Sequence, residues 1–408
     1  MGAALVACES AKETPVKKDA RASAVAPREI PVVVVADAAP ARKVFLHGAG
    51  RCGECHEKMF DEWETSAHAR AASSPLFKAA AAAANQTSCL ECHAPLLAEA
   101  PKDIIASEGV TCDVCHTLRD PKPSKAGRGF RLAVDDMVKF GPRCDLKDHY
   151  FHRMGCSPDH QQAELCGSCH WWEPRGVPVF TEYADWKAGP AAAANQPCQD
   201  CHMPKEKASL AVGAPARTNV PHHGMLGLAA DLRARALGLE VAVKDEAGTL
   251  AVTVSVKNEG AGHHVPGGLP ERRLVVVTRI VDAAGAEVAI ERRILGRVLV
   301  DAKGVEVPFW RALKVGSDSR IAPGATWSET FSFTPAGAGT VEVEVVYRGA
   351  SDAMIKELSI APADVEQHTM ASAKVPFGAP GKTGRAKLPR TVAVRPPVAG
   401  KRPAKGSK

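Results

Sequence analysis

The stretch Cys52-Gly-Glu-Cys-His56 decides how this chain folds, because the same Cys-x-x-Cys-His pattern occurs four more times. The other copies are Cys89–His93, Cys112–His116, Cys166–His170 and Cys198–His202. Two cysteines at this spacing add to the two vinyl groups of one haem, and the histidine that follows binds its iron. Zinc sites also use Cys-x-x-Cys pairs, but they need no histidine directly after each second cysteine. We therefore predict five covalently attached haem c groups.

These motifs give every predicted haem two thioether bonds and one proximal iron ligand. The thioether cysteines are Cys52, Cys55, Cys89, Cys92, Cys112, Cys115, Cys166, Cys169, Cys198 and Cys201. The proximal ligands are His56, His93, His116, His170 and His202. Haem c is attached after export, so we expect the protein in the periplasm of a bacterium, or on its outer membrane or cell surface as a lipoprotein.

Three of the thirteen cysteines lie outside the motifs. Cys8 ends the string Leu5-Val-Ala-Cys8, which resembles a bacterial lipobox and predicts a lipid anchor. The alternative is a chance match, because a charged segment and a full apolar segment do not precede Cys8. In an oxidising compartment Cys144 and Cys156 can form a disulfide that closes a short loop, or remain two unpaired thiols.

The amino-acid composition and the positions of the motifs divide the chain into regions. Residues 1–43 form an export or lipobox remnant and a linker, in which Pro31–Val35 could be a strand. Residues 44–230 hold all five motifs, so the porphyrins must supply much of the hydrophobic core there. We expect short helices and long loops in this part, with helices over Glu57–Ala72 and Ala79–Ala84.

From residue 238 the hydrophobic period changes to two. The runs are Leu239–Lys244, Leu250–Lys257, Leu274–Thr278, Thr330–Thr334 and Val341–Tyr347. Mostly alternating runs separated by turn residues predict an immunoglobulin-like antiparallel β-sandwich over residues 238–360, and hence an α+β protein. Residues 378–408 contain nine Lys or Arg and no Asp or Glu, which predicts a disordered basic tail.

The net charge of +6 comes from this tail, since the rest of the chain carries −3 before any haem propionate is counted. We expect the tail to contact an acidic surface or an envelope polyanion and not nucleic acid, the alternative being a solvated tail without a partner. No run of twenty apolar residues predicts a membrane-spanning helix, so membrane association would come from lipid or partners.

Residues 48–350 resemble a known family, the multihaem c-type cytochromes related to the tetrahaem cytochromes of hydroxylamine oxidation and to doubled-motif cytochromes with a C-terminal sandwich. The resemblance is carried by Cys52–Trp63 with Ser66-Ala-His68, Gly109–His116, Leu165–His170, Tyr183–Trp186 with Cys198–Pro204, and Asn258–Gly267. It implies that the distal iron ligands are His68, His152, His160, one histidine of His222 and His223, and one of His263 and His264. From the two pairs we select His223 and His263.

A haem with two protein ligands transfers electrons, whereas a haem with an open face can bind and reduce a substrate. With five distal histidines for five haems, we expect an electron carrier and not an enzyme, exchanging electrons with redox proteins of the cell envelope. One alternative is a reductase of the nitrite, hydroxylamine or tetrathionate class with one open haem, although no acid–base group is identified. Another is a homo-oligomer, as a subunit of a conductive filament.

Overall fold

The computed structural model describes residues 44 and 46–387, apart from 86, 135, 136, 228, 247 and 379–383. All of them belong to one compact unit. The lipobox at Cys8, the possible strand at Pro31–Val35 and residues 388–408 of the basic tail lie outside the described residues. None of the described helices is both long enough and apolar enough to cross a bilayer.

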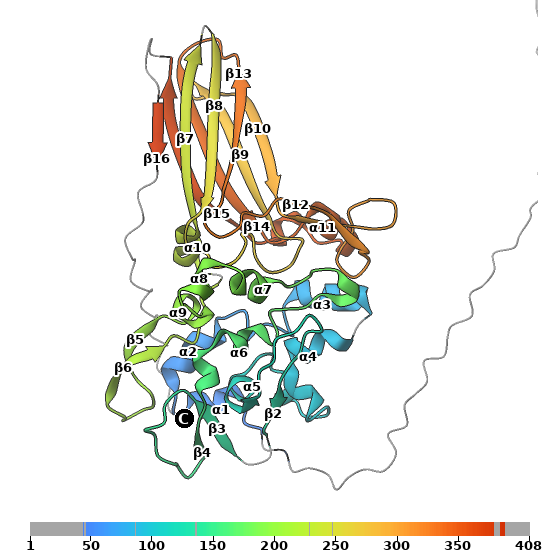
Figure 1. Ribbon diagram of the computed structural model, residues 1–408, viewed down its shortest axis with the longest axis vertical. Helices are drawn as coiled ribbons and strands as arrows, with labels where there is room; N and C mark the ends of the chain where they lie inside the picture. The colour runs from blue at the N-terminus through green and yellow to red at the C-terminus, as the bar shows by residue number, and fades with distance from the viewer. Residues whose placement is uncertain are drawn as a thin grey trace, which may run out of the picture. The chain divides into compact units, whose positions relative to one another are not determined.

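The N-terminal part consists of short helices joined by loops and two-stranded ribbons (Figure 1). Its α-helices are α1 Ala49–Gly53, α2 Glu57–Glu64, α3 Pro75–Ala84, α4 Leu90–His93, α5 Cys112–Thr117, α6 Ala163–Gly167, α7 Glu182–Lys187, α8 Pro190–Ala193, α9 Cys198–His202 and α10 Ala230–Ala236. Its 3-10 helices are η1 Thr87–Cys89, η2 Pro95–Ala98, η3 Ile105–Ser107, η4 Pro158–Gln161 and η5 Pro174–Gly176. Its strands are β1 Leu118–Arg119, β2 Arg131–Leu132, β3 Val138–Gly141, β4 Arg153–Cys156, β5 Lys205–Ser209 and β6 Ala216–Pro221.

The two helices expected between the first and second motifs are present, with one difference in length. The alanine-rich run lies in α3, which Ser74 caps by accepting a hydrogen bond from the Phe77 amide. Helix α2 ends at Glu64, whereas the sequence predicts helix to Ala72. The chain turns there because Ser66 is buried and the His68 carbonyl accepts a hydrogen bond from Val110, which lies just before the third motif.

The C-terminal part is the predicted antiparallel sandwich (Figure 1). One sheet has the order β13-β8-β7-β16, formed by Thr326–Phe333, Thr249–Asn258, Leu237–Glu246 and Gly384–Lys387. The other has the order β10-β9-β14-β15, formed by Glu287–Leu295, Arg273–Asp282, Gly339–Arg348 and Gln367–Phe377. The ribbon of β11 Arg297–Val300 and β12 Lys314–Asp318, helix α11 Asp352–Leu358 and η6 Pro362–Asp364 complete this part. Alternate residues of β8 and β14 are buried between the sheets, as period-two strands require.

The structure corrects the expected end of the sandwich at residue 360. Strand β15 pairs with β14 over its full length, and β16 pairs with β7 inside the segment expected to be a disordered tail. Both strands are hard to recognise in the sequence. The core positions Ala371 and Ala373 of β15 have small side chains, Pro376 interrupts its pattern, and β16 is a four-residue strand flanked by Gly, Pro and Lys.

Candidate haem-binding site

Each attachment motif folds as a single helical turn, which explains its spacing. The His56 amide donates to the Cys52 carbonyl at 2.8 Å, and the His170 amide donates to the Cys166 carbonyl at 3.0 Å. Residues i, i+3 and i+4 lie on one face of a helix, so both thiols and the imidazole point to the same side. That is the arrangement needed to hold one edge and the iron of a porphyrin.

A connected cavity of about 2010 Å³ runs through the N-terminal part. The cysteines and histidines of the first four motifs line it, together with Gln199, Asp200 and Met203 at the fifth motif. Leu269, Arg272 and Phe309 of the C-terminal part also contribute to its wall. The size of the cavity and its donor set of thiols and imidazoles therefore fit several large, flat cofactors.

Three proximal histidines are oriented by backbone carbonyl groups. His56 Nδ1 lies 2.6 Å from the Leu210 carbonyl oxygen, His93 Nδ1 lies 2.8 Å from that of Ala71, and His116 Nδ1 lies 2.6 Å from that of Phe140. An Nδ1–H that donates to a carbonyl fixes the tautomer and leaves the Nε2 lone pair for a metal. These three rings are thus prepared to bind iron through Nε2.

Four of the five proximal histidines face a second histidine ring, and three of these pairs line the cavity. The ring centroids are 6.3 Å apart for His56 with His152 and for His170 with His68. They are 6.4 Å apart for His116 with His223 and for His202 with His263. Two imidazoles on opposite sides of one metal ion, each nitrogen about 2.0 Å from it, have ring centroids about 6.3 Å apart. The four separations fit two axial ligands on one iron.

His93 of the second motif differs from the other proximal histidines. Among the described histidines, none is in ring contact with it, and the aromatic neighbour of its ring is Phe77, stacked at 4.2 Å. Phe77 comes from α3, and the pattern of motifs did not predict its role. The sequence does place α3 next to this site, because the helix ends five residues before Cys89 of the second motif.

The remaining histidines lie elsewhere. The predicted ligand His160 lies beside His116 with its ring centroid 5.4 Å away, and its Nε2 is 3.1 Å from the Cys115 carbonyl oxygen. His116 is thus in ring contact with two histidines, and of the two separations the 6.4 Å to His223 is the one that fits two ligands on one metal ion. His222 Nε2 lies 3.6 Å from Glu62, and His264 Nδ1 lies 3.2 Å from Asp185. His149 stacks on Tyr150, and His368 contacts Glu366.

Burial keeps three of the facing imidazoles neutral. Burial, together with the positive charge that a neighbouring histidine would carry, lowers the pKa of His68, His202 and His223 to about 4. A neutral imidazole retains the lone pair that a metal needs. At neutral pH these rings are therefore in the form that binds iron.

The thiols of different motifs meet in pairs. The Cys52 and Cys112 thiols lie close enough for each to shift the pKa of the other, and the same holds for Cys92 with Cys169 and for Cys166 with Cys198. Cys115 of the third motif lies near enough to Cys166 and Cys169 of the fourth to act on both electrostatically. Each contact brings together the haem-attachment edges of two motifs that are separated in the sequence.

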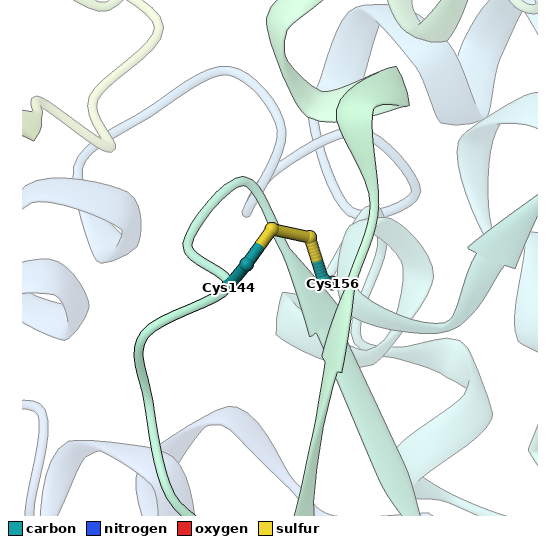
Figure 2. The surroundings of a disulfide bond; sticks show 2 residues. All are labelled: Cys144 and Cys156. Carbon is teal, nitrogen blue, oxygen red and sulfur yellow. A yellow bond between two sulfur atoms is a disulfide. The ribbon is translucent and has the colours of Figure 1, made fainter.

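The disulfide that the sequence left open between Cys144 and Cys156 is present (Figure 2). It joins a loop to the end of β4 across a sequence separation of 12 residues, and His152 lies within the closed loop. Cross-linking a loop of this size stabilises a protein mainly by restricting its unfolded chain.

Replacing Cys144 and Cys156 together by serine should lower the free energy of unfolding by about 3 kcal/mol, the value expected for a loop of this length. The shift in the denaturant midpoint of the oxidised protein measures this effect. The same double variant under reducing conditions is the control, because wild type and variant should then unfold at similar midpoints. Equal midpoints under oxidising conditions would show that the disulfide does not stabilise the fold.

Comparisons with known proteins agree with the fold described above. Residues 51–117 match the family model described as cytochrome c554 and c-prime. The fold is similar to the crystal structure of a penta-heme cytochrome c552 from Thermochromatium tepidum, with a TM-score of 0.66 and 22% identity, covering 81% of this chain and 99% of that one. A putative β-galactosidase from Bacteroides fragilis matches over 36% of this chain and 16% of its own, at 14% identity and a TM-score of 0.18, which carries no structural argument. No curated protein matches the sequence.

Proposed function

We propose that this chain, a multihaem c-type cytochrome by its motifs, its fold and the family model that its residues 51–117 match, transfers electrons through five covalently bound haems. The observation that carries the proposal is the set of four facing histidine pairs at 6.3–6.4 Å. When bound, a haem with two axial histidines supplies a one-electron couple and leaves no iron position for a substrate. The protein's part is to hold, orient and bury these groups.

The pairs give a ligand set for four irons. His152 serves the first motif, His223 the third, His68 the fourth and His263 the fifth. Every distal residue comes from a segment remote from the motif that it faces, so folding and haem attachment depend on each other. His160 is outside this set, because its Nε2 contacts a carbonyl oxygen.

From the thiols that lie close together we infer a route for electrons between the haems. Cysteine attaches at the porphyrin edge, and tunnelling weakens steeply with the distance between edges, so motifs whose thiols touch should exchange electrons fastest. The contact of Cys52 with Cys112 connects motifs one and three, and that of Cys166 with Cys198 connects four and five. Cys115 connects three to four. The route thus runs one, three, four, five, and motif two branches from four through Cys92 and Cys169.

The location and partners of the protein are part of the same proposal. Haem c attachment supports a place in the periplasm or, with a lipid on Cys8, on the outer membrane or cell surface of a bacterium. Redox proteins of the cell envelope would then donate and accept electrons at the ends of the route. The nine cations after residue 377 support contact with an acidic surface and not a role in binding nucleic acid.

A second function is favoured by one observation, the lack of a facing histidine at His93 among the described residues. A haem held there would have one protein ligand from its motif and an iron face open to a small molecule. Such a site at the end of a branch would suit a reductase of the nitrite, hydroxylamine or tetrathionate class. Assembly with a second copy that supplies a ligand, as in a filament, would close the same face.

Spectra of the purified, fully loaded protein test both functions. We expect four low-spin ferric haems and one high-spin haem by electron paramagnetic resonance, and one haem that shifts its optical spectrum with cyanide or nitrite. His160→Gln is the matched control, because His160 is outside the proposed ligand set. It should leave both the number of low-spin haems and the number of high-spin haems unchanged. Five low-spin haems that ignore both ligands would remove the second function, while several high-spin haems would contradict the proposed histidine pairs.

A further inference from the structure

His263 lies in the loop between β8 and β9, at the end of the sandwich that meets the N-terminal part. Its Nδ1 lies 2.8 Å from the carbonyl oxygen of His264, an arrangement that places the ring proton on Nδ1 and leaves the Nε2 lone pair for a metal. The loop is tied to its own sheet by Asn258, whose buried amide donates to the His263 carbonyl at 2.9 Å and to the Ile321 carbonyl at 3.0 Å. Val265 and Ile321 exchange two backbone hydrogen bonds beside it.

A second set of contacts ties the loop to α7 in the N-terminal part. His264 Nδ1 lies 3.2 Å from Asp185 Oδ2, and the same oxygen is 3.2 Å from Arg320 Nη1. Thr181 Oγ1 donates to Asp185 at 3.0 Å. Close packing accompanies these bonds, because a Cβ placed on Gly262 would meet the Ala191 side chain at 3.0 Å.

The charges at this junction are well buried. The side chains of Arg320 and Asp185 are 6% and 13% exposed, so the attraction between them is weakly screened. Arg320 also contacts Asp318, which in turn accepts from Arg297 at 3.1 Å. Arg297 donates to the Pro178 carbonyl oxygen at 2.8 Å and so anchors the network in the chain before α7.

We infer that Asp185 and Arg320 are positioning residues for the iron ligand His263. Arg320 orients Asp185, Asp185 holds the His264 side chain, and the His264 carbonyl fixes the ring of His263. The sandwich thereby does more than cover the haem region, because it supplies an axial ligand whose aim depends on an ion-pair network across the junction. This inference rests on the proposed pairing of His263 with His202.

The test compares Asp185→Asn, Arg320→Gln and Arg320→Lys with the control Arg311→Gln, which removes an exposed surface ion pair to Glu357. All are purified fully loaded and studied by electron paramagnetic resonance. We expect Asp185→Asn and Arg320→Gln to replace the low-spin signal of one haem, partly or fully, by a high-spin or altered low-spin signal. Added imidazole should restore a low-spin state. Arg320→Lys should be milder, and Arg311→Gln should leave the spectrum of wild type.

His263→Ala separates the inference from its premise. We expect His263→Ala to change the signal of one haem. If the double variant with Arg320→Gln then has the same spectrum as His263→Ala alone, the network acts through His263. Should Arg320→Gln and Asp185→Asn give folded, less stable proteins with unaltered spectra, the network is only a structural clamp and the inference is wrong. If His263→Ala itself leaves all signals unchanged, the proposed pairing fails instead. Where Arg320→Gln does not fold, Asp185→Asn alone decides between these outcomes.

Discussion

Replacing Asp113 by alanine should lower the free energy of unfolding by about 3–5 kcal/mol, the cost of removing one partner of a buried ion pair. Asp113 occupies a variable position of the third motif, yet it is 1% exposed, and its Oδ1 lies 2.6 Å from Lys139 Nζ. Its Oδ2 accepts from the His47 amide at 2.9 Å. The variant leaves Lys139, 13% exposed, without its partner and leaves that amide without its acceptor.

The position of this pair extends the effect to the haem site. Lys139 precedes Phe140, whose carbonyl oxygen lies 2.6 Å from His116 Nδ1, so Asp113 helps to hold β3 beside the third motif. We therefore expect a weaker low-spin signal from that haem as well as the lower stability. Denaturant midpoints of the haem-loaded proteins measure the loss in the free energy of unfolding, provided that the m-values of wild type and variant are equal.

Arg131→Gln is the matched control, because Arg131 pairs with Asp120 on the surface with 62% and 58% of the side chains exposed. Such a pair contributes about 0–1 kcal/mol. Equal midpoints for the two variants would show that burial adds nothing to the Asp113 pair. Asp113→Asn, which retains the shape without the charge, should fall between them.

The sequence predicts the parts of this protein that are determined by local spacing. Cys52 and His56 lie one helical turn apart, so the motif alone defines which side chains share a face. Strand β8 alternates over ten residues, so its buried positions also follow from the sequence. The positions of all five proximal histidines and the antiparallel sandwich follow from such patterns.

Pairing across the cavity depends on how remote loops pack, and spacing does not encode it. His152 and His160 both precede the fourth motif, and both resemble ligands in the sequence. The structure brings His152 opposite His56 of the first motif and leaves His160 beside Cys115. The buried pair of Asp113 and Lys139 is equally hidden, because the two charges lie 26 positions apart in the sequence and meet only when β3 packs on the motif.

Replacing His68 by methionine should raise the reduction potential of the haem at His170 by on the order of 0.1 V, a fraction of the roughly 0.8 V range that axial ligands span. His68 is buried, and its ring centroid lies 6.3 Å from that of His170. Methionine is unbranched and flexible, so its thioether can reach an iron that the imidazole now faces. A thioether favours ferrous iron more than an imidazole does, so the potential rises.

The consequence for conduction follows from the central place of the fourth motif. Its thiols lie next to those of the second and fifth motifs, and Cys115 of the third lies nearby, so electrons from every other branch would pass this haem in the proposed route. A higher potential there makes a trap, which should slow transfer from the first motif to the fifth by about tenfold for each 59 mV. Spectroelectrochemical titration gives the potentials, and stopped-flow reduction gives the rate. His149→Met, on an exposed ring stacked on Tyr150, should alter neither. If His68→Met left all five potentials unchanged, His68 would not be the ligand at His170, and the route through the fourth motif would need another partner.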